Sequence, residues 1–416
     1  MGAFIGHSGG ALMVLFVALL ALRCAKRLGL VLWPAAPARP LAPRWAPGPG
    51  ALALAAFGVL AAQFLFAFLC WRDLGQTGGL AAFWQHFFER FTTAGDSPHY
   101  LLLAREGYAA EGDAAKYIVF YPLYPLAVRL MHALLAPFSA SWEAAALAVS
   151  WLCWGGAGAA MLALAGQDLP REQAAFAVAL MALYPFGFFA LGVYTESLFL
   201  LLSLLCMLFA RRGSWPAAGV FGALAVLCRN QGLVLLLPLL YLWLRARRQK
   251  KQGPASLALA LPLPLLSWGG YLALNWRLFG SPFAFFEFLA APPWYQTTRW
   301  IGENLAQHWQ MALDYPGLAP FIYHAQLALY FAAMALLFFG LWKKCPTHWL
   351  IWGGGYLGMS YLAGWLISGG RYVFGCLPLY LIGASLPRPA RWLLAAVSAF
   401  FLWKMGVWYM QGQAIM

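Results

Sequence analysis

The sequence predicts an all-α protein that crosses a membrane many times. Of its 416 residues, 63% are hydrophobic and only 10% are charged, whereas soluble domains carry about 25% charged residues. Apolar runs of about 15 to 23 residues recur along the chain, which suits a hydrocarbon core roughly 30 Å thick. The 21 Trp and 18 Tyr residues suit membrane interfaces as well as packed interiors. We therefore expect a polytopic bundle of helices.

The net charge of +14 reflects membrane orientation and not a nucleic-acid partner. Basic residues gather in short clusters between the apolar runs, and aromatic residues are not interleaved with them as in a nucleic-acid groove. This pattern is typical of cytoplasmic loops under the positive-inside rule. The clusters are Arg23/Lys26/Arg27, Arg211/Arg212, Arg245/Arg247/Arg248/Lys250/Lys251, Lys343/Lys344 and Arg388/Arg391.

The seven cysteines lie in or beside apolar segments without C-x-x-C spacing, so neither a disulfide framework nor a zinc site is indicated. The first basic cluster follows the opening apolar run instead of preceding it, unlike the order in a cleavable signal peptide. We expect this run to remain as an anchor with its N-terminus outside.

The apolar runs define the elements in chain order, and two units are predicted. Residues 1–50 hold an anchor helix and a Pro/Ala-rich linker, LWPAAPARPLAPRWAPGPG, which we expect to be extended and cytoplasmic. Residues 51–416 form a transmembrane catalytic domain without an internal repeat, unlike many secondary transporters. Candidate spans are roughly 3–22, 52–70, 143–165, 173–193, 195–210, 216–228, 231–245, 255–275, 325–342, 347–368, 372–386 and 392–411.

Two long loops, at about 72–116 and 276–324, fall outside the cell when every basic cluster is placed in the cytoplasm. Three short polar segments, Tyr194–Ser197, Arg229–Gly232 and Gly369–Tyr372, fall on the same side. Six of the thirteen acidic residues lie in the first loop: Asp73, Glu89, Asp96, Glu106, Glu111 and Asp113. Because polar residues are tolerated in membrane proteins where water or function requires them, the chemistry is expected here.

The topology works only if segment 117–137 does not fully cross the membrane. Pro122 and Pro125 leave about a dozen helical residues after them, which is too few for a span. We expect this segment to be re-entrant or juxtamembrane. Earlier in the same loop, LAAFWQHFFERF has apolar residues at 80, 83, 84, 87, 88 and 91. This spacing predicts an amphipathic helix on the membrane surface.

Asp96 admits two interpretations. An external carboxylate near a surface helix can act as a general base that takes a proton from an acceptor hydroxyl. Alternatively, Ser97 caps a helix, Pro98 is its first residue, and Asp96 adds negative charge near the helix start. Spacing alone favours the helix start, because caps are commoner than catalytic acids. His99 can share a helix face with Asp96 and is a hydrogen-bond partner for base or substrate, since two such side chains leave a metal short of ligands.

Glu196 and Arg229 are the other candidates within apolar sequence. Glu196 is either a first-turn acid behind Thr195 or a functional carboxylate deep in the membrane domain. Arg229 begins a polar run that interrupts the apolar stretch 217–245, which is too long for one ordinary span and short for two. It either binds a lipid phosphate through paired donors or snorkels at a helix end. Because two shortened helices meet at this polar corner, the functional interpretation of Arg229 as a binding residue is favoured. Arg371 lies in a similar basic corner.

Five segments in this order resemble the PIG-V family, whose eukaryotic members are GPI mannosyltransferase 2. They are DSPHYLLLAREGY, FYPLYPLAVRL, LYPFGFFALGVYTESLFLLLS, LAVLCRNQGLVLL and GGRYVFGCLPLY, and they cover most of 90–240 and the region around 371. The family belongs to the GT-C glycosyltransferases, multi-span enzymes that take a sugar from a polyprenyl-phosphate carrier. These enzymes carry an essential acidic residue in the first external loop.

The resemblance implies a GT-C-type bundle in which Asp96 is the catalytic acidic residue, and it makes the general base the favoured interpretation. The substrate-binding residues that it implies are His99, Tyr100, Tyr194, Glu196, Arg229, Asn230, Arg371 and Tyr372. The arginines are candidates for the carrier's phosphate. Because a lipid phosphate is already a good leaving group, no metal or other cofactor is expected.

The expected reaction is an inverting transfer of a hexose, mannose, from polyprenyl phosphate to a lipid-linked or extracytoplasmic glycan. The expected partners are this donor, the glycolipid or glycan acceptor and membrane lipids. A composition rich in Ala, Trp and Arg is typical of a bacterial protein, so we expect the bacterial inner membrane with an extracytoplasmic active site. Since bacteria generally lack GPI anchors, the acceptor stays open. The alternative is a transporter or flippase of lipid-linked sugars, in which Arg229 and Glu196 are pathway charges.

Overall fold

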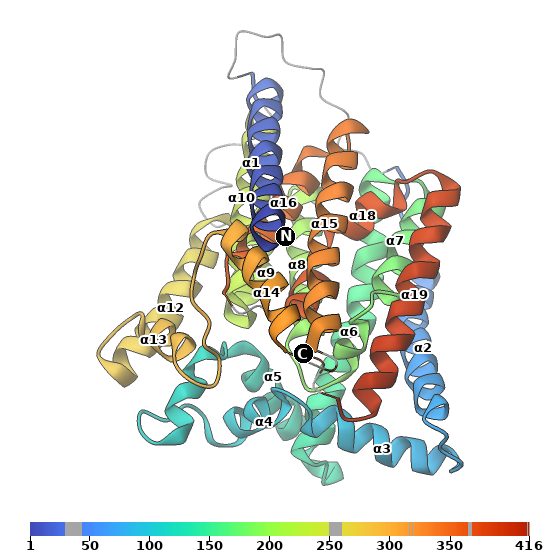
Figure 1. Ribbon diagram of the computed structural model, residues 1–416, viewed down its shortest axis with the longest axis vertical. Helices are drawn as coiled ribbons and strands as arrows, with labels where there is room; N and C mark the ends of the chain where they lie inside the picture. Colours follow the sequence, from blue (N-terminus) through green and yellow to red (C-terminus); the bar gives the residue numbers. More distant parts are fainter. Residues whose placement is uncertain are drawn as a thin grey trace.

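The chain is an all-α polytopic membrane protein (Figure 1). The computed structural model describes residues 1–29, 44–248, 260–315, 317, 319–364, 368–413 and 415. Most of the predicted Pro/Ala-rich linker, the first residues of the predicted span 255–275, and Lys250 and Lys251 lie outside the described residues.

Within the described residues, five helices are long and apolar enough to cross a membrane. They are α1 (Gly2–Arg27), α2 (Pro49–Asp73), α6 (Trp142–Asp168), α15 (Ala319–Trp342) and α19 (Arg388–Met410). In α6, 67% of the apolar window is buried inside the protein, compared with 17% in α2. Helix α6 is therefore central, and α2 turns most of its apolar surface outward, as expected for a helix that faces lipid.

Shorter helices complete the bundle around α6. They are α7 (Arg171–Ala182), α8 (Glu196–Arg212), α9 (Trp215–Cys228), α10 (Leu236–Arg248), α12 (Pro262–Phe279), α16 (Thr347–Tyr361), α17 (Gly369–Phe374) and α18 (Pro378–Ala384). The expectation of single spans at 173–193 and 372–386 is wrong. Helix α7 ends before Pro185 and a 3-10 turn, η3 (Gly187–Leu191), follows it, while α17 and α18 separate just before Pro378. A proline cannot donate the hydrogen bond that would continue either helix.

The first long loop and the segment that follows it fold into a layer across one end of the bundle (Figure 1). This layer consists of α3 (Leu80–Thr93), α4 (Ser97–Glu106), η1 (Asp113–Val119), α5 (Leu123–Leu135) and η2 (Ala136–Phe138). The predicted helix at 80–91 is confirmed as α3, and its apolar residues divide into two rows. Phe83, Phe87 and Phe91 are buried, whereas Leu80, Trp84 and Phe88 are exposed. The exposed row suits contact with a membrane surface.

Segment 117–137 is bent. The axes of η1 and the following helical segment Leu123–Phe138 meet at 107°, and Pro122 stands at the break. A straight span is therefore absent from this segment, and the bent pair is either a broken span or a re-entrant loop. The re-entrant or juxtamembrane placement stays a prediction.

The second long loop returns to the bundle through α13 (Ala284–Ala290) and α14 (Ile301–Asp314). Helix α13 packs on η1 of the first loop, and α14 packs along α1. A side chain at Gly6 would collide with the carbonyl of Gly302, so the absence of a Cβ atom permits the close approach of α1 and α14. Both loops thus meet at the end of the bundle that holds the candidate active site.

Candidate active site

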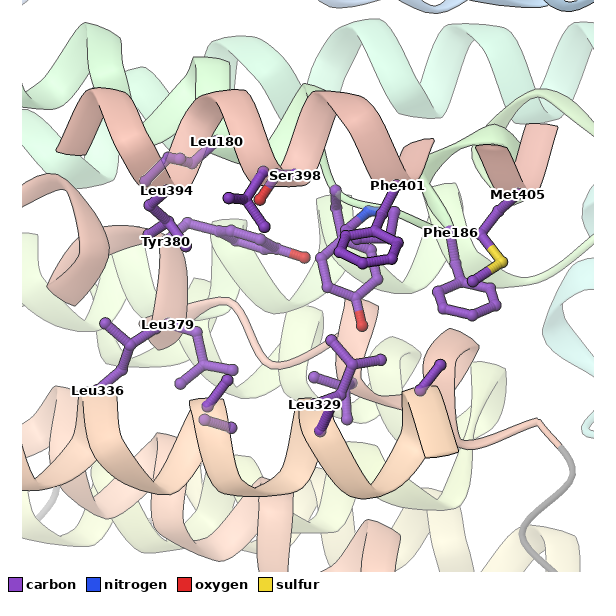
Figure 2. A pocket seen from close by; sticks show the side chains of 18 of the residues that line it. Leu180, Phe186, Leu329, Leu336, Leu379, Tyr380, Leu394, Ser398, Phe401 and Met405 are labelled. Atoms are coloured by element: carbon purple, nitrogen blue, oxygen red, sulfur yellow. The ribbon is translucent and has the colours of Figure 1, made fainter. Parts of the chain in front are cut away.

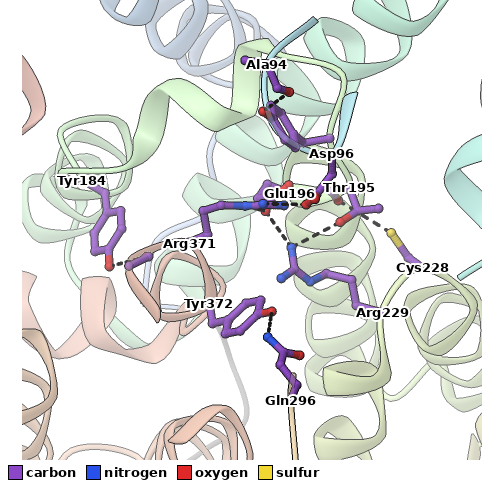
Figure 3. Close-up of polar contacts among 12 residues, drawn as sticks. Ala94, Asp96, Tyr184, Thr195, Glu196, Cys228, Arg229, Gln296, Arg371 and Tyr372 are labelled. Carbon is purple, nitrogen blue, oxygen red and sulfur yellow. Dashed lines mark hydrogen bonds and ion pairs between the residues drawn. The ribbon is translucent and has the colours of Figure 1, made fainter. Parts of the chain in front are cut away.

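Two acidic and two basic side chains from distant parts of the chain form one network, which we call the charged network (Figure 3). Arg371 donates from Nη1 to Asp96 Oδ2 at 2.7 Å and from Nε to Glu196 Oε1 at 2.8 Å. Arg229 donates from Nη1 to the same Glu196 oxygen, also at 2.8 Å. The two guanidinium groups therefore converge on a single carboxylate oxygen.

Asp96 stands at the N-terminal cap position of α4, but its side chain makes no capping hydrogen bond. It binds Arg371 instead, and Ser97, expected as the cap, is the first helical residue. Gly95 sets the turn before Asp96, because its φ is +56° and a Cβ there would lie 2.8 Å from the hydroxyl oxygen of Tyr194. That hydroxyl donates to the carbonyl oxygen of Ala94 at 2.7 Å. The turn is thereby tied to the segment that leads into α8.

Glu196 is the first residue of α8, and 2% of it is exposed. Thr195 precedes it at the cap position without a capping side-chain bond. The hydroxyl of Thr195 accepts a hydrogen bond from Arg229 at 3.2 Å. The side chains of both residues therefore bind arginines of the charged network. Neither caps the start of α8, as the helix-start interpretation expected.

Arg229 lies where the apolar stretch 217–245 breaks. Its backbone is extended, with φ −156° and ψ 146°, so α9 stops at Cys228 and a 3-10 turn, η4 (Asn230–Leu235), leads into α10. The predicted polar corner between two shortened helices is confirmed. The guanidinium of Arg229 also lies over the ring of Tyr372, 5.4 Å from its centroid. Arg371 lies over the ring of Tyr194 at 4.7 Å, which favours the charged form of both arginines through cation–π contact.

A cavity of about 380 Å³ opens beside the charged network. Seven of the nine predicted site residues line it: Asp96, His99, Tyr100, Arg229, Asn230, Arg371 and Tyr372. Asp96 exposes 23% of its side chain. Tyr194 and Glu196, predicted to bind substrate, do not line the cavity. Because each contacts Arg371, they position the arginine and do not form the cavity wall.

His99 faces the cavity from α4 and stacks on Tyr117, with 4.4 Å between the ring centroids. Desolvation lowers the pKa of His99; the carboxylate of Asp96 opposes this shift and Lys116 reinforces it. The imidazole is therefore neutral at pH 7 and has one donor and one acceptor nitrogen. Such a group can orient a hydroxyl next to Asp96.

Sequence patterns missed the side of the cavity that the second loop supplies. Trp294 and Gln296 line it, and Gln296 donates to the hydroxyl of Tyr372 at 3.4 Å. A backbone bridge between Thr298 and Ala363 holds this segment against the end of α16. The two prolines at 292 and 293 signal a turn in the sequence, but no local pattern specifies which part of the chain the turn covers.

A second cavity, of about 430 Å³, is almost entirely apolar and lies between α15 and α19 (Figure 2). Helix α17 connects the two cavities, since it supplies Arg371 to the first and Val373 to the second. Tyr184 lines the apolar cavity and donates from its hydroxyl to the carbonyl of Gly370 at 2.8 Å. The charged network and an apolar recess therefore adjoin the same short helix.

Among the side chains that the structure describes, no group of three or more His, Cys, Asp and Glu residues is arranged to hold a metal ion. Asp96 and His99 belong to no such group.

No family model matches the chain. Over 147 residues the chain is 34% identical to GPI alpha-1,6-mannosyltransferase 2 of Rattus norvegicus, a match that covers 33% of this chain and 29% of the relative. The chain thus matches less than a third of the length of that protein. The similarity supports a relationship to the mannosyltransferase family, and together with the apolar helices it supports a multi-pass membrane protein with glycosyltransferase ancestry.

Proposed function

We propose that this protein is a GT-C-type membrane glycosyltransferase that transfers a hexose, mannose, from a polyprenyl-phosphate donor to a hydroxyl of a lipid-linked or extracytoplasmic glycan. The observation that carries the proposal is the shared cavity, where the carboxylate of Asp96 stands beside the guanidinium groups of Arg229 and Arg371. Transfer from a phosphate carrier requires a base for the nucleophile and positive charge at the leaving group.

Asp96 is the proposed base. Its Oδ2 accepts from Arg371, while Oδ1 has no hydrogen-bond partner among the described residues. An acceptor hydroxyl that binds Oδ1 would lose its proton as its oxygen attacks the anomeric carbon from the face opposite the phosphate, which inverts the configuration. General-base catalysis contributes about 10²–10⁴-fold to rate. His99, neutral beside Asp96, would orient that hydroxyl.

Arg229 and Arg371 are the proposed phosphate site. Because both donate to one oxygen of Glu196, their remaining N–H groups lie close enough to bind one phosphate. Paired guanidinium donors match phosphate oxygens in geometry. Charge on the departing phosphate grows during transfer, and the arginines stabilise it without reorganising, because Glu196 already holds them in place.

The apolar cavity supports a lipid carrier. It begins beside α17, two residues beyond Arg371, and is walled by side chains such as Phe186, Leu329 and Met405 (Figure 2). We propose that it takes the isoprenoid chain while the phosphate lies on the arginines. Described residues of the predicted basic clusters, among them Arg27, Arg211 and Lys344, line a cavity at the other end of the bundle. Under the positive-inside rule this arrangement supports an extracytoplasmic candidate active site, and we propose the bacterial inner membrane as its location.

Purified protein in lipid nanodiscs tests the proposal, with polyprenyl phosphate carrying a radiolabelled mannose and a panel of glycolipid acceptors. Label on a new glycolipid supports transfer. A parallel measurement in sealed vesicles follows the labelled donor across the bilayer. Label that changes sides but never leaves its carrier would refute the enzyme and support the alternative, a transporter of lipid-linked sugars.

A further inference from the structure

A third cavity, of about 580 Å³, lies at the end of the bundle opposite the charged network. Helices α8 and α16 each run from one of these two ends of the bundle to the other. Helix α8 begins with Glu196 of the charged network and carries Arg211, which lines this cavity, in its last turn. Their separation of 15 positions along the chain corresponds to a rise of about 22 Å along the helix axis. Helix α16 likewise begins at Thr347 beside this cavity and reaches Ser360 beside the other.

The cavity wall is strongly cationic. Its basic residues come from α1, the segment before α2, α8, α10 and the turn between α15 and α16, and they are Arg23, Arg27, Arg44, Arg211, Arg245, Lys343 and Lys344. Asp168 is the one acidic residue among the described residues that line it. In Figure 1 the end of α1 that carries Arg27 lies at the top, away from α3, α4 and α5.

The acidic residue of this cavity is paired with neighbouring side chains, whereas several of the basic residues have no acidic partner. Asp168 accepts from Arg211 at 2.8 Å and lies 3.4 Å from Nε2 of His348. Arg23 fastens α1 to the turn between α15 and α16, since it donates to the hydroxyl of Thr347 at 3.1 Å and to the carbonyl oxygen of Cys345.

Arg27, Arg44, Lys343 and Lys344 form no ion pair with a carboxylate within the described part of the chain. Like charges that face one concave space raise its positive potential and favour the entry of an anion. The positive-inside rule accounts for basic residues in cytoplasmic loops, but it does not require segments so far apart in sequence to converge on one cavity.

The residues beside the cavity are of the kind found at a membrane surface. Helix α1 exposes Val14, Val17 and Leu22 in the turns that precede Arg23, so its exposed apolar surface ends where the cationic wall begins. Trp342 is 71% exposed, and the ammonium of Lys343 lies 4.3 Å from the centre of its ring. Exposed tryptophan beside lysine is typical of the membrane interface. At this depth the common anions are phosphate groups.

We propose that this cavity is a binding site for a phosphate-bearing anion, with the guanidinium groups of Arg27 and Arg44 and the ammonium of Lys344 as its principal donors. Guanidinium groups bind phosphate oxygens in pairs, and an ammonium binds as a compact point charge. The phosphate arrives either as the headgroup of an anionic membrane lipid or as a soluble phosphate. The site is independent of the proposed glycosyl transfer, because it shares no residue with the candidate active site.

Native mass spectrometry and thermal unfolding of the full chain test the site in two arms. One arm compares phosphatidylglycerol with phosphatidylcholine in mixed micelles, and the other titrates inorganic phosphate at constant ionic strength. The double variant Arg27→Gln/Lys344→Gln removes two donors whose side chains form no hydrogen bond or ion pair within the described part of the chain. Arg212→Gln is the control, because Arg212 is exposed at the same end without lining the cavity.

We expect saturable binding that the double variant weakens by about tenfold or more, since each basic residue near an anionic lipid surface contributes substantially. Binding in the lipid arm identifies a headgroup, and binding in the phosphate arm identifies a soluble ligand. Arg44→Gln, which changes an exposed side chain, should weaken the same binding with the unfolding temperature unchanged. Binding in neither arm, or binding equal in wild type and double variant, overturns the proposal.

Discussion

Glu196→Gln is the substitution that most sharply tests the organisation of the charged network. The side chain keeps its size but loses the charge that two guanidinium groups share, each at 2.8 Å from Oε1. At an effective dielectric constant of about 20, one ion pair at about 4 Å is worth roughly 4 kcal/mol before desolvation is considered. Glu196 and Arg371 are 2% and 5% exposed in their side chains, so water cannot replace the lost charge.

Removing one partner of such a buried ion pair destabilises a protein by about 3–5 kcal/mol, because the remaining charges are left uncompensated. We expect the free energy of unfolding in mixed micelles to fall by that amount. The KM for the donor should also rise on the order of tenfold, since the loss of one charged hydrogen bond of about 1.5–3 kcal/mol would misalign the phosphate site. Glu196→Asp, which restores the charge, should recover part of both losses.

Glu143→Gln is the matched control. Its partner Arg105 is 42% exposed and Glu143 is 27% exposed in their side chains, so the same chemical change should cost about 1 kcal/mol or less and leave the donor KM unchanged. An unfolding free energy for Glu196→Gln that matches this control, together with an unaltered KM, would refute the reasoning that Glu196 holds the arginines in place.

Three further outcomes are expected. Gly95→Ala should slow transfer, because the added Cβ presses on Tyr194 beside the charged network. Stability should fall by only about 1–2 kcal/mol, which is the strain of a left-handed backbone. An unchanged transfer rate would contradict this expectation. Arg229→Lys should raise the KM for the donor and leave that for the acceptor unchanged, because lysine lacks the paired donors for phosphate; equal effects on both would count against a phosphate role. Burial without a hydrogen-bond partner lowers the pKa of His308 to about 4, so the unfolded chain gains its proton first as pH falls. His308 should therefore contribute a loss of about 2–3 kcal/mol of stability between pH 6.5 and 4.5. In unfolding titrations His308→Gln should remove that contribution, whereas the exposed His7→Gln should leave it in place.

The sequence predicted individual corners of the site but not how they combine. The polar run at Arg229 is visible because it interrupts an apolar stretch, and the helix break there is confirmed. The pairing of Asp96 with Arg371 joins residues 275 positions apart, and no local pattern encodes such a contact. Glu196 illustrates the same limit: the sequence shows an acid between apolar runs, but only the fold shows that its carboxylate faces two arginines and does not line the cavity.

The departures in the fold have a common physical cause. Apolar composition marked 173–193 as one span, although Pro185 ends the helix within it. A hydropathy pattern measures how well a segment dissolves in lipid, and it does not register where backbone hydrogen bonding must stop. The contribution of the second long loop to the cavity could not be predicted for another reason. Gln296 reaches the cavity through a turn that is positioned by packing on η1 and α16, contacts that depend on the assembled fold.

The most direct test of the central proposal is the rate of mannose transfer by Asp96→Asn, measured in nanodiscs at saturating donor and acceptor. Asparagine keeps an oxygen for Arg371 and removes the ability to take up a proton. We expect the free energy of unfolding to fall by about 1 kcal/mol or less, because the side chain of Asp96 is 23% exposed and Arg371 keeps Glu196 as a partner. The donor KM should stay within about threefold of wild type, and the rate should fall by about 10²–10⁴-fold. A variant that transfers mannose at the wild-type rate would contradict the assignment of Asp96 as the base.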